Sequence, residues 1–526
     1  MLTYFVIVPI LIGVFLYLFS FVTAGRIIAV LAQIGMVVAA WYLFFASQEA
    51  YVITNIGNFD SVLGIFLKAD YLTSVFILLT TFVFLIATIY SFNEYNSRLF
   101  WFILYVWQSS IIGIFLTMDL FNLFVLMEVS TIVVAVMIMY KRNNRSMYDG
   151  MVYLMVNIVA VQFYLFGVGY IYMLTGAMDM QLVTARLALL DKSQLVLPYA
   201  LIMTSVVFKC ALVPLYSWLP KAHGTPGAPS AVSAILSGLH IKSGLYIFLR
   251  FQEMFAGINM SEFFIALGII TSIVGIVLAI SQSDIKLILA YSTVAQIGLI
   301  MIGLNIGNIY SFTGALYHVI NHALFKAALF LSAGIIIHTF HTRDIYKMRG
   351  VFRRIPTVGT ATILAVLGIT GAPFFNGSIS KYFMATGAYG LLDWTIILIN
   401  IGTIIVFIRY SAILWGRPTP NTEAPKLETC KQIAIFTLCA LCFIGGIFGV
   451  QFIQFLFNMD VYLSRDGYIE KMAIFAASWA LGFLIYIGIL KNNHLRRLRD
   501  FDLGFRGICV CMGIFFGVIL VVVNVV

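Results

Sequence analysis

Charged side chains are scarce in this sequence. Asp, Glu, Lys and Arg together make up 10% of the 526 residues, whereas 62% are hydrophobic. Ordinary soluble domains carry about 25% charged residues. A chain of this length with so few charges cannot cover a water-exposed surface, and its apolar share exceeds what a core can hide. The composition excludes a soluble enzyme and a disordered protein.

Motifs for cofactors and metals are also missing. Among the six cysteines, Cys439 and Cys442 form a single Cys-x-x-Cys pair within an apolar run, and neither a second pair nor a Cys/His spacing completes a structural zinc site. No glycine-rich phosphate loop follows a strand, so the sequence predicts neither an ATPase nor a dehydrogenase site. We therefore expect no bound cofactor and no metal in this chain.

Long apolar runs are what the sequence has instead. A transmembrane helix needs about 20 predominantly apolar residues. Segmenting on that rule predicts an all-α polytopic membrane protein with sixteen candidate spans. The spans lie near residues 2–21, 27–46, 72–92, 99–118, 120–140, 151–174, 199–219, 229–249, 261–280, 286–304, 309–337, 357–381, 393–416, 432–450, 472–490 and 507–525.

The distribution of basic residues predicts the orientation of these spans. The net charge is +10, and most Lys and Arg fall in short loops on one side of the segmentation. Under the positive-inside rule this places both ends of the chain outside. Residues 47–71 are predicted to form an ordered external loop, and residues 177–197 could hold an interfacial helix.

Two spans carry helix-breaking residues. Pro214 lies in the seventh span, and Pro373 lies in the twelfth between Gly371 and Gly377. Proline removes a backbone hydrogen bond and clashes with the preceding turn. Such breaks are tolerated at membrane depth only where they face protein or water. These two spans are therefore candidates for the functionally important segments of the protein.

Ionisable residues inside the spans are the strongest functional signal. One acid, Glu128, lies deep in a span, and four lysines lie in others: Lys209, Lys242, Lys326 and Lys381. Three histidines, His240, His318 and His322, share these regions. Each charge at the bilayer centre costs about 2.5–3.5 kcal/mol on insertion scales. Such groups persist when they are paired, hydrated or neutralised.

Their spacing suggests proton movement. His318, His322 and Lys326 stand at i, i+4 and i+8, so they line one helix face. Imidazoles and amines at one-turn intervals, bridged by water, can pass protons along. A pair between Glu128 and Lys209 that opens and closes would act as an electrostatic switch.

Other interpretations stand beside this one. A lysine near a helix end often snorkels to the interface, and a single histidine is often a satisfied core residue. His318 and His322 could bind haem or a metal, but no carboxylate or thiolate joins them within the span. A hydrolase would need a buried acid beside the histidine. Whether His240 and His223 take part is left open.

Five stretches resemble a known family. They are LFNLFVLMEVS (120–130), WLPKAHGTPGAPSAVSAILSGLHIKSGLYIFLR (218–250), SDIKLILAYSTVAQIG (283–298), HVINHALFKAALFLSAG (318–334) and GAPFFNGSISK (371–381). Together they resemble the antiporter-like proton-translocating membrane subunits of Mrp-type Na+/H+ antiporters, energy-converting hydrogenases and complex I.

The resemblance implies fourteen core helices with two inverted five-helix repeats, each with one broken helix. On this chain it implies N-terminal helices and an external loop in 1–98, repeats in 99–250 and 261–416, and accessory helices in 417–526. It places Glu128 and Lys209 on the family's ion pair and Lys242 on its central lysine. His322 and Lys326 fall on its linking row, and Lys381 on its exit-side position.

Three features depart from the family pattern. Position 381 is Lys where one branch has Glu, which favours the D-type Mrp component, the hydrogenase component or other complex I branches. The loop from His223 to Pro229 is about two residues longer than usual. The last two spans lie beyond the fourteen-helix core.

The expected function is proton translocation, with Na+ exchange left open, by a subunit of a multisubunit complex in a prokaryotic cell (inner) membrane. The site residues are Glu128, Lys209, Lys242, His318, His322, Lys326 and Lys381. The expected partners are other membrane subunits of an Mrp, hydrogenase or complex I-like assembly, and no nucleic acid. The chain itself has no expected redox site. One alternative is a non-conducting structural subunit of a complex I-like NADH/quinone oxidoreductase, and a weaker one is a carrier for a small organic solute.

Overall fold

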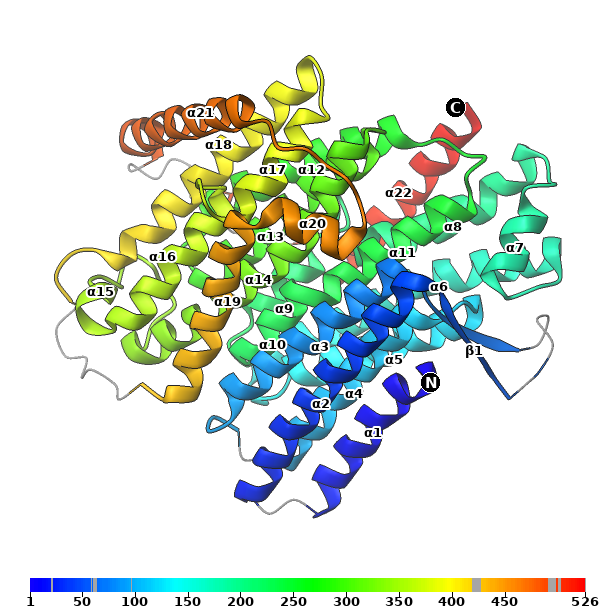
Figure 1. The fold of residues 1–526 in the computed structure, drawn as a ribbon, viewed down its shortest axis with the longest axis horizontal. Helices are drawn as coiled ribbons and strands as arrows, with labels where there is room; N and C mark the ends of the chain where they lie inside the picture. The colour runs from blue at the N-terminus through cyan, green and yellow to red at the C-terminus, as the bar shows by residue number, and fades with distance from the viewer. Residues whose placement is uncertain are drawn as a thin grey trace. The chain divides into compact units, whose positions relative to one another are not determined.

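Apolar runs of this length fold as helices because a helix satisfies its own backbone hydrogen bonds where no water can. The computed structural model describes residues 1–19, 22–57, 59, 64–95, 97–418, 427–490, 498–499 and 503–525. Within these residues the chain is helical throughout, apart from one two-stranded sheet and the connecting loops (Figure 1).

The helices divide between two compact units. Unit 1 contains Met1–Ala228, Leu239–Met260 and Leu503–Val526, and unit 2 contains Pro229–Gly238 and Ser261–Asp502. The elements of unit 1 are α1 (Leu2–Phe19), α2 (Val22–Glu49), β1 (Val52–Ile56), β2 (Ile65–Ala69), α3 (Tyr71–Ser91), α4 (Arg98–Leu116), α5 (Leu120–Ile138), α6 (Asn144–Thr175), α7 (Met180–Leu187), α8 (Lys192–Lys209), α9 (Trp218–Gly224), α11 (Ile241–Met254) and α22 (Phe505–Val525).

Unit 2 contains most of the second half of the chain. Its elements are α10 (Ser230–Ile235), α12 (Ser261–Ser281), α13 (Ile285–Asn305), α14 (Ile309–Phe340), α15 (Val351–Arg354), α16 (Pro356–Thr370), α17 (Asn376–Thr386), α18 (Leu391–Ser411), η2 (Ala412–Leu414), α19 (Thr429–Ile447), α20 (Gly449–Phe457), α21 (Arg465–Ile485) and the π-helical η3 (Tyr486–Leu490). A π-helical turn, η1 (Leu236–His240), follows α10 and precedes α11 in the chain.

Each of the sixteen predicted spans coincides with a helix or a broken helix. Fourteen helices in the described part of the chain are long and apolar enough to cross a membrane. The remaining two predicted spans are the interrupted ones. α8 ends at Lys209 before the Pro214 loop, and the twelfth span is divided between α16 and α17. The protein is therefore an all-α, multi-pass membrane protein.

Both loops singled out in the sequence contain regular secondary structure in their described residues. In the predicted external loop, β1 and β2 pair antiparallel, with Val52 opposite Ala69 and Ile56 opposite Ile65. The short helix α7 lies where an interfacial helix was predicted. Asp179 caps this helix, because its side chain accepts a hydrogen bond from the backbone N–H of Leu182.

Corresponding elements recur in the two units. α6 and α14 both contain 32 residues, and each follows a helix whose N-cap is an aspartate. In unit 1 this residue, Asp119, forms an isolated antiparallel bridge with Asp179; in unit 2 Asp284 forms one with Asp344. An aspartate bridge of the same kind therefore fixes the start of α5 and the start of α13.

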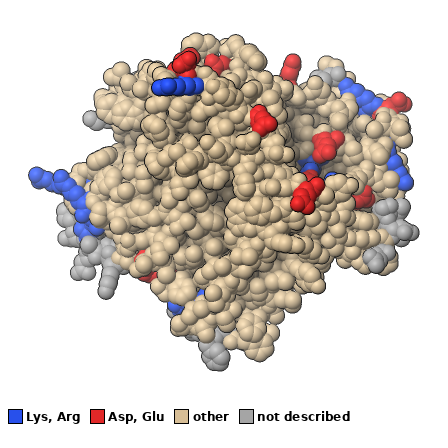
Figure 2. Space-filling model, viewed as in Figure 1, with Lys and Arg blue, Asp and Glu red and all other residues tan. Residues whose placement is uncertain are grey.

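Charged side chains are sparse on the molecular surface. Figure 2 shows a face on which a few blue and red groups are separated by wide areas of other residues. Many exposed side chains are large and apolar, including those of Leu31, Tyr42, Ile132 and Leu398. Such a surface suits contact with lipid tails or with other membrane subunits.

Candidate functional site

In unit 1, the end of α8 holds a buried amine. Lys209 is the last residue of this helix, where the negative end of the helix dipole favours a cation. Its ammonium nitrogen donates hydrogen bonds to Thr131 Oγ1 (2.9 Å) and Asn157 Oδ1 (3.0 Å). The indole N–H of Trp218 donates to the carbonyl of Phe208, which satisfies a backbone acceptor freed by the break after α8.

Glu128 lies near this amine without bonding to it. In the described part of the chain, Lys209 forms no ion pair with Glu128 within hydrogen-bonding distance, and Glu128 Oε1 is buried without a hydrogen-bond partner. The two groups still interact electrostatically. The structure thus shows an open arrangement of the pair that the sequence predicts to open and close, with two neutral acceptors on Lys209.

The helix α11 approaches α8 closely beside this site. A Cβ on Gly244 would stand 2.8 Å from the backbone carbon of Lys209, so a larger residue there would push the helices apart. His240 lies one turn before Gly244 and is buried. Its Nδ1 faces the Trp107 indole N–H at 3.5 Å, and its Nε2 faces the Tyr153 hydroxyl at 3.3 Å. Lys242 on the same helix is also buried, with 1% of its surface exposed.

In unit 2, α13, α14 and α17 hold a continuous polar network. His318 on α14 is fully buried, with Nδ1 2.8 Å from the Ser380 hydroxyl and Nε2 2.9 Å from the Gln296 side-chain oxygen. The Gln296 amide donates onward to the Thr403 hydroxyl at 3.2 Å. The rings of His318 and His322 lie 6.4 Å apart, as expected for residues one turn apart on a helix.

Lys326, one helical turn after His322 on α14, is more deeply buried than Lys381. It is fully shielded from solvent, and it donates hydrogen bonds to the Leu289 carbonyl (2.8 Å) and to the Ser292 hydroxyl. Its nitrogen also lies 5.8 Å from the centre of the Phe407 ring. All three groups are neutral, so within the described residues no anion compensates a charge on this lysine.

Lys381 lies at the break between α16 and α17. Gly371 takes a left-handed conformation there, with a φ of +80° that favours glycine. The Lys381 ammonium donates to the carbonyl of Ile369 (2.6 Å), one of the acceptors at the end of α16, and to Asn400 Oδ1 on α18 (2.7 Å). The helix break predicted from Pro373 thus supplies a partner for the buried lysine.

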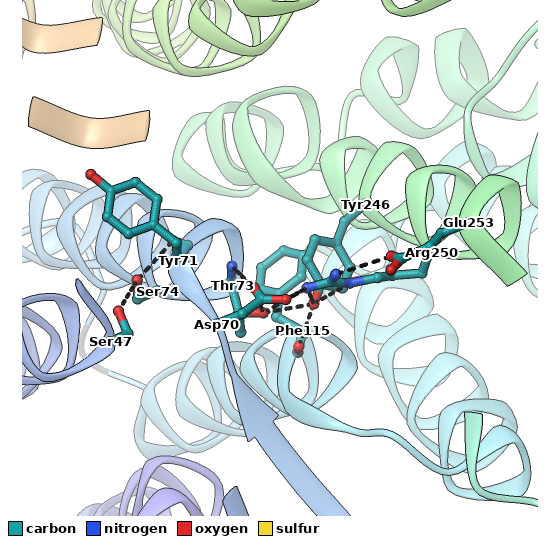
Figure 3. Close-up of polar contacts among 9 residues, drawn as sticks. All are labelled: Ser47, Asp70, Tyr71, Thr73, Ser74, Phe115, Tyr246, Arg250 and Glu253. Atoms are coloured by element: carbon teal, nitrogen blue, oxygen red, sulfur yellow. Dashed lines mark hydrogen bonds and ion pairs between the residues drawn. The ribbon is translucent and has the colours of Figure 1, made fainter. Parts of the chain in front are cut away.

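A second polar cluster lies at the other end of α11 (Figure 3). Arg250 donates to Asp70 Oδ2 (2.5 Å) and to the hydroxyls of Thr73 and Tyr246 (3.1 and 3.0 Å). The Tyr246 hydroxyl donates in turn to the Phe115 carbonyl at 2.8 Å. Lys242, Tyr246 and Arg250 stand at i, i+4 and i+8, so this cluster continues the helix face that carries Lys242.

Asp70 holds this cluster together as an anion. Burial alone would raise the pKa of Asp70, but the Arg250 charge and the hydrogen bonds from Thr73 outweigh it, so the pKa lies below its usual value of 3.8. Its carboxylate also accepts the backbone N–H of Thr73 at 2.9 Å and so caps α3.

The Asp70→Asn variant should destabilise the purified protein by about 2 kcal/mol, because it removes a charge-assisted hydrogen bond and leaves Arg250 with only the exposed Glu253 carboxylate, 3.6 Å away, as an anion. A carboxyl with a lowered pKa stabilises the fold above its unfolded pKa and loses that contribution as pH falls through the folded value. Thermal unfolding should therefore show the full gap between wild type and variant at pH 7 and a smaller gap at pH 3. An unchanged gap at pH 3 would contradict this role.

Several residues of these networks were not predicted from the sequence. They are Thr131, Asn157, Gln296, Ser380, Asn400, Asp70 and Arg250. Three of them are single side-chain amides within apolar runs, which is a usable signal. Among the described residues, no group of three or more His, Cys, Asp or Glu side chains could hold a metal ion.

Comparison with known proteins finds relatives that match most of this chain. The chain is 28% identical to the D component of the Na+/H+ antiporter of Alkalihalophilus pseudofirmus, over 89% of this chain and 98% of that protein. It is 32% identical to the N component of the NADH-quinone oxidoreductase of Desulforudis audaxviator, over 69% of this chain and 75% of that protein. The fold matches one protein of the Mrp complex from a Dietzia species with a TM-score of 0.80 at 20% identity, over 94% of this chain and 99% of that one.

A family model provides the assignment. The transmembrane family described as NADH:quinone oxidoreductase/Mrp antiporter matches residues 117–406, more than half of the chain. The matched segment contains every buried lysine and histidine of both networks, and it includes both helix breaks. The chain therefore belongs to the NADH:quinone oxidoreductase/Mrp antiporter transmembrane family.

Proposed function

We propose that this protein translocates protons across a prokaryotic cell membrane as one subunit of a multisubunit complex, with an Mrp-type antiporter or a membrane-bound hydrogenase-type complex as its host. Relatives named as antiporter and hydrogenase components support this assignment. In an Mrp-type host, proton movement would be exchanged for Na+ movement by the complex.

The observation that carries the proposal is the network in unit 2. His318 bonds to a hydroxyl and an amide, Lys326 to a hydroxyl and Lys381 to an amide oxygen, and hydroxyl and amide groups can both donate and accept. His322 lies between His318 and Lys326 on α14. An apolar core would be more stable without them, because each buried charge is costly. Proton transfer needs titratable groups that follow one another along a helix, whereas a purely structural core does not need them.

We assign the steps as follows. In unit 1, Lys209 takes up a proton, and the nearby Glu128 carboxylate stabilises its charged form when the pair closes. Lys242 and His240 lie on the adjacent helix and are the candidates to receive that proton. In unit 2, a proton moves along α14 through Lys326, His322 and His318. It passes last to Lys381 on α17.

The internal correspondence of the units supports the predicted repeats, 99–250 and 261–416. The two 32-residue helices and the two aspartate bridges occupy corresponding places in these segments. Each segment also contains one broken helix with a lysine at or beside the break. We infer that each repeat provides half of the pathway, with residues 1–98 and 417–526 as additional helices.

The host complex can be identified by purification from native membranes. We expect mass spectrometry to find several hydrophobic subunits, including a second antiporter-like chain, purified with this protein. Nickel–iron hydrogenase or other iron–sulfur subunits would instead assign it to a redox-driven complex. If the chain purifies alone and moves protons in liposomes by itself, the proposal that it is a subunit is wrong.

A further inference from the structure

A cavity of about 60 Å³ lies against Lys381. It is bounded by α17, α18 and α21, and its polar lining comprises Ser378, Lys381, Asn400, Tyr468, Lys471 and Ser478. The rest of the lining is mainly apolar and includes Ile396, Met472 and Phe475. A cavity of this size has room for several water molecules, which the polar side chains can bind. Asn400 both accepts the hydrogen bond from Lys381 and lines the cavity, so the amine is in direct contact with this space.

The helix α21, which lies beyond the fourteen-helix core implied by the family resemblance, covers this cavity. It lies beside α18, as Figure 1 shows, and its buried residues are Ser478 and Gly482. The Tyr468 hydroxyl lies 2.8 Å from the Ser378 hydroxyl and accepts the backbone N–H of Phe374 at 3.2 Å. These two contacts attach the start of α21 to the break between α16 and α17.

An ion pair makes the second attachment. The Lys471 ammonium donates to Asp393 Oδ1 on α18 at 3.3 Å, and both side chains are partly exposed. Lys471 and Lys381 line the same cavity, and two positive charges there would repel each other. Asp393 neutralises Lys471, so Lys471 does not oppose a charge on Lys381 across the cavity.

We propose that this cavity is the route by which the proton on Lys381 reaches water, and that Tyr468, Lys471 and Asp393 are the positioning residues of this route. In the step, an N–H bond of the Lys381 ammonium breaks and a water molecule in the cavity takes the proton. The neutral amine is then protonated again from the His318 side through the network in unit 2. This inference rests on the proposed proton transfer through the buried lysines and histidines of unit 2. It assigns to α21 a part in proton release.

Cysteine labelling tests the cavity independently of transport. Ser478 lines the cavity, whereas Leu481, three residues further along α21, is exposed on the apolar surface. In membranes containing the whole complex, a hydrophilic methanethiosulfonate reagent should modify Ser478→Cys about tenfold faster than Leu481→Cys, because thiols react as thiolates, which form in water. Mass spectrometry of each labelled peptide separates these sites from the native cysteines. Equal rates, or faster reaction at Leu481→Cys, would overturn the proposal.

Flux measurements test the positioning residues. Lys471→Gln and Asp393→Asn should each slow proton flux several-fold, and the exchanged pair Lys471→Asp with Asp393→Lys should recover most of it. Glu470→Gln is the matched control, because it removes an exposed charge next to Lys471. Unchanged flux in both single variants would overturn their role. Unchanged flux in Lys381→Ala would instead refute the proposed function, while the labelling result would still decide whether the cavity is wet.

Discussion

Replacing Lys326 with methionine should abolish proton flux while leaving the protein at least as stable as the wild type. The side chain is fully buried and bonds only to neutral groups among the described residues. An isosteric apolar residue at a buried charged position is often neutral or stabilising. A proton-transfer group contributes about 100- to 10,000-fold to a rate. We therefore expect flux to fall by at least about 100-fold.

The measurement is dye-reported proton movement in inverted membrane vesicles, with the amount of assembled complex determined in the same vesicles. Ser332→Ala on the same helix is the matched control. Ser332 is buried, and its hydroxyl has no hydrogen-bond partner among the described residues, so its loss should change neither flux nor assembly. If Lys326→Met retains wild-type flux, then His318, His322 and Lys326 do not conduct protons along α14.

The second large effect is expected at Lys209. Lys209→Ala removes the amine and should lower flux by about 100-fold. It also leaves the Asn157 side-chain oxygen without its donor, which costs about 1–3 kcal/mol, whereas the groups around Lys326 keep a partner because the Ser292 hydroxyl donates to the Leu289 carbonyl. Unlike Lys326→Met, this variant should therefore be less stable than the wild type, and thermal unfolding in detergent should show it.

Glu128→Gln separates the electrostatic role of the acid from the role of the amine. Because Glu128 acts on Lys209 without a direct hydrogen bond, its loss should slow flux by about tenfold, equivalent to about 1.4 kcal/mol, and leave stability nearly unchanged. If the protein were a non-conducting structural subunit, Lys209→Ala and Glu128→Gln would both leave proton flux unchanged in complexes shown to be fully assembled. Wild-type flux in Lys209→Ala would favour the structural alternative.

Much of the fold could be predicted because apolar length alone locates a membrane span. All sixteen runs coincide with helical segments, and the prolines at positions 214 and 373 mark where two of them break. The π-helical turn at Leu236–His240 could not be foreseen, because it depends on backbone hydrogen bonds and not on composition. The pairing of β1 with β2 was also not predicted, because the sequence indicated only an ordered loop there.

The candidate site was less predictable than the fold. Buried lysines and histidines are conspicuous in apolar runs, but their partners are ordinary polar residues whose importance depends on tertiary packing. Thr131 and Asn157 become partners of Lys209 only because α5, α6 and α8 pack together in unit 1. The sequence favoured Glu128 as that partner because opposite charges suggest an ion pair, whereas the structure places neutral acceptors on the amine.

The most direct test of the account is proton flux driven by an imposed K+ diffusion potential or Na+ gradient in liposomes that contain the purified complex. Wild-type complex should change the internal pH when the gradient is applied, and complex assembled with the double variant Lys209→Ala/Lys326→Met should not. Equal flux in the two preparations, with equal amounts of every subunit, would contradict the claim that these buried lysines carry protons across the membrane.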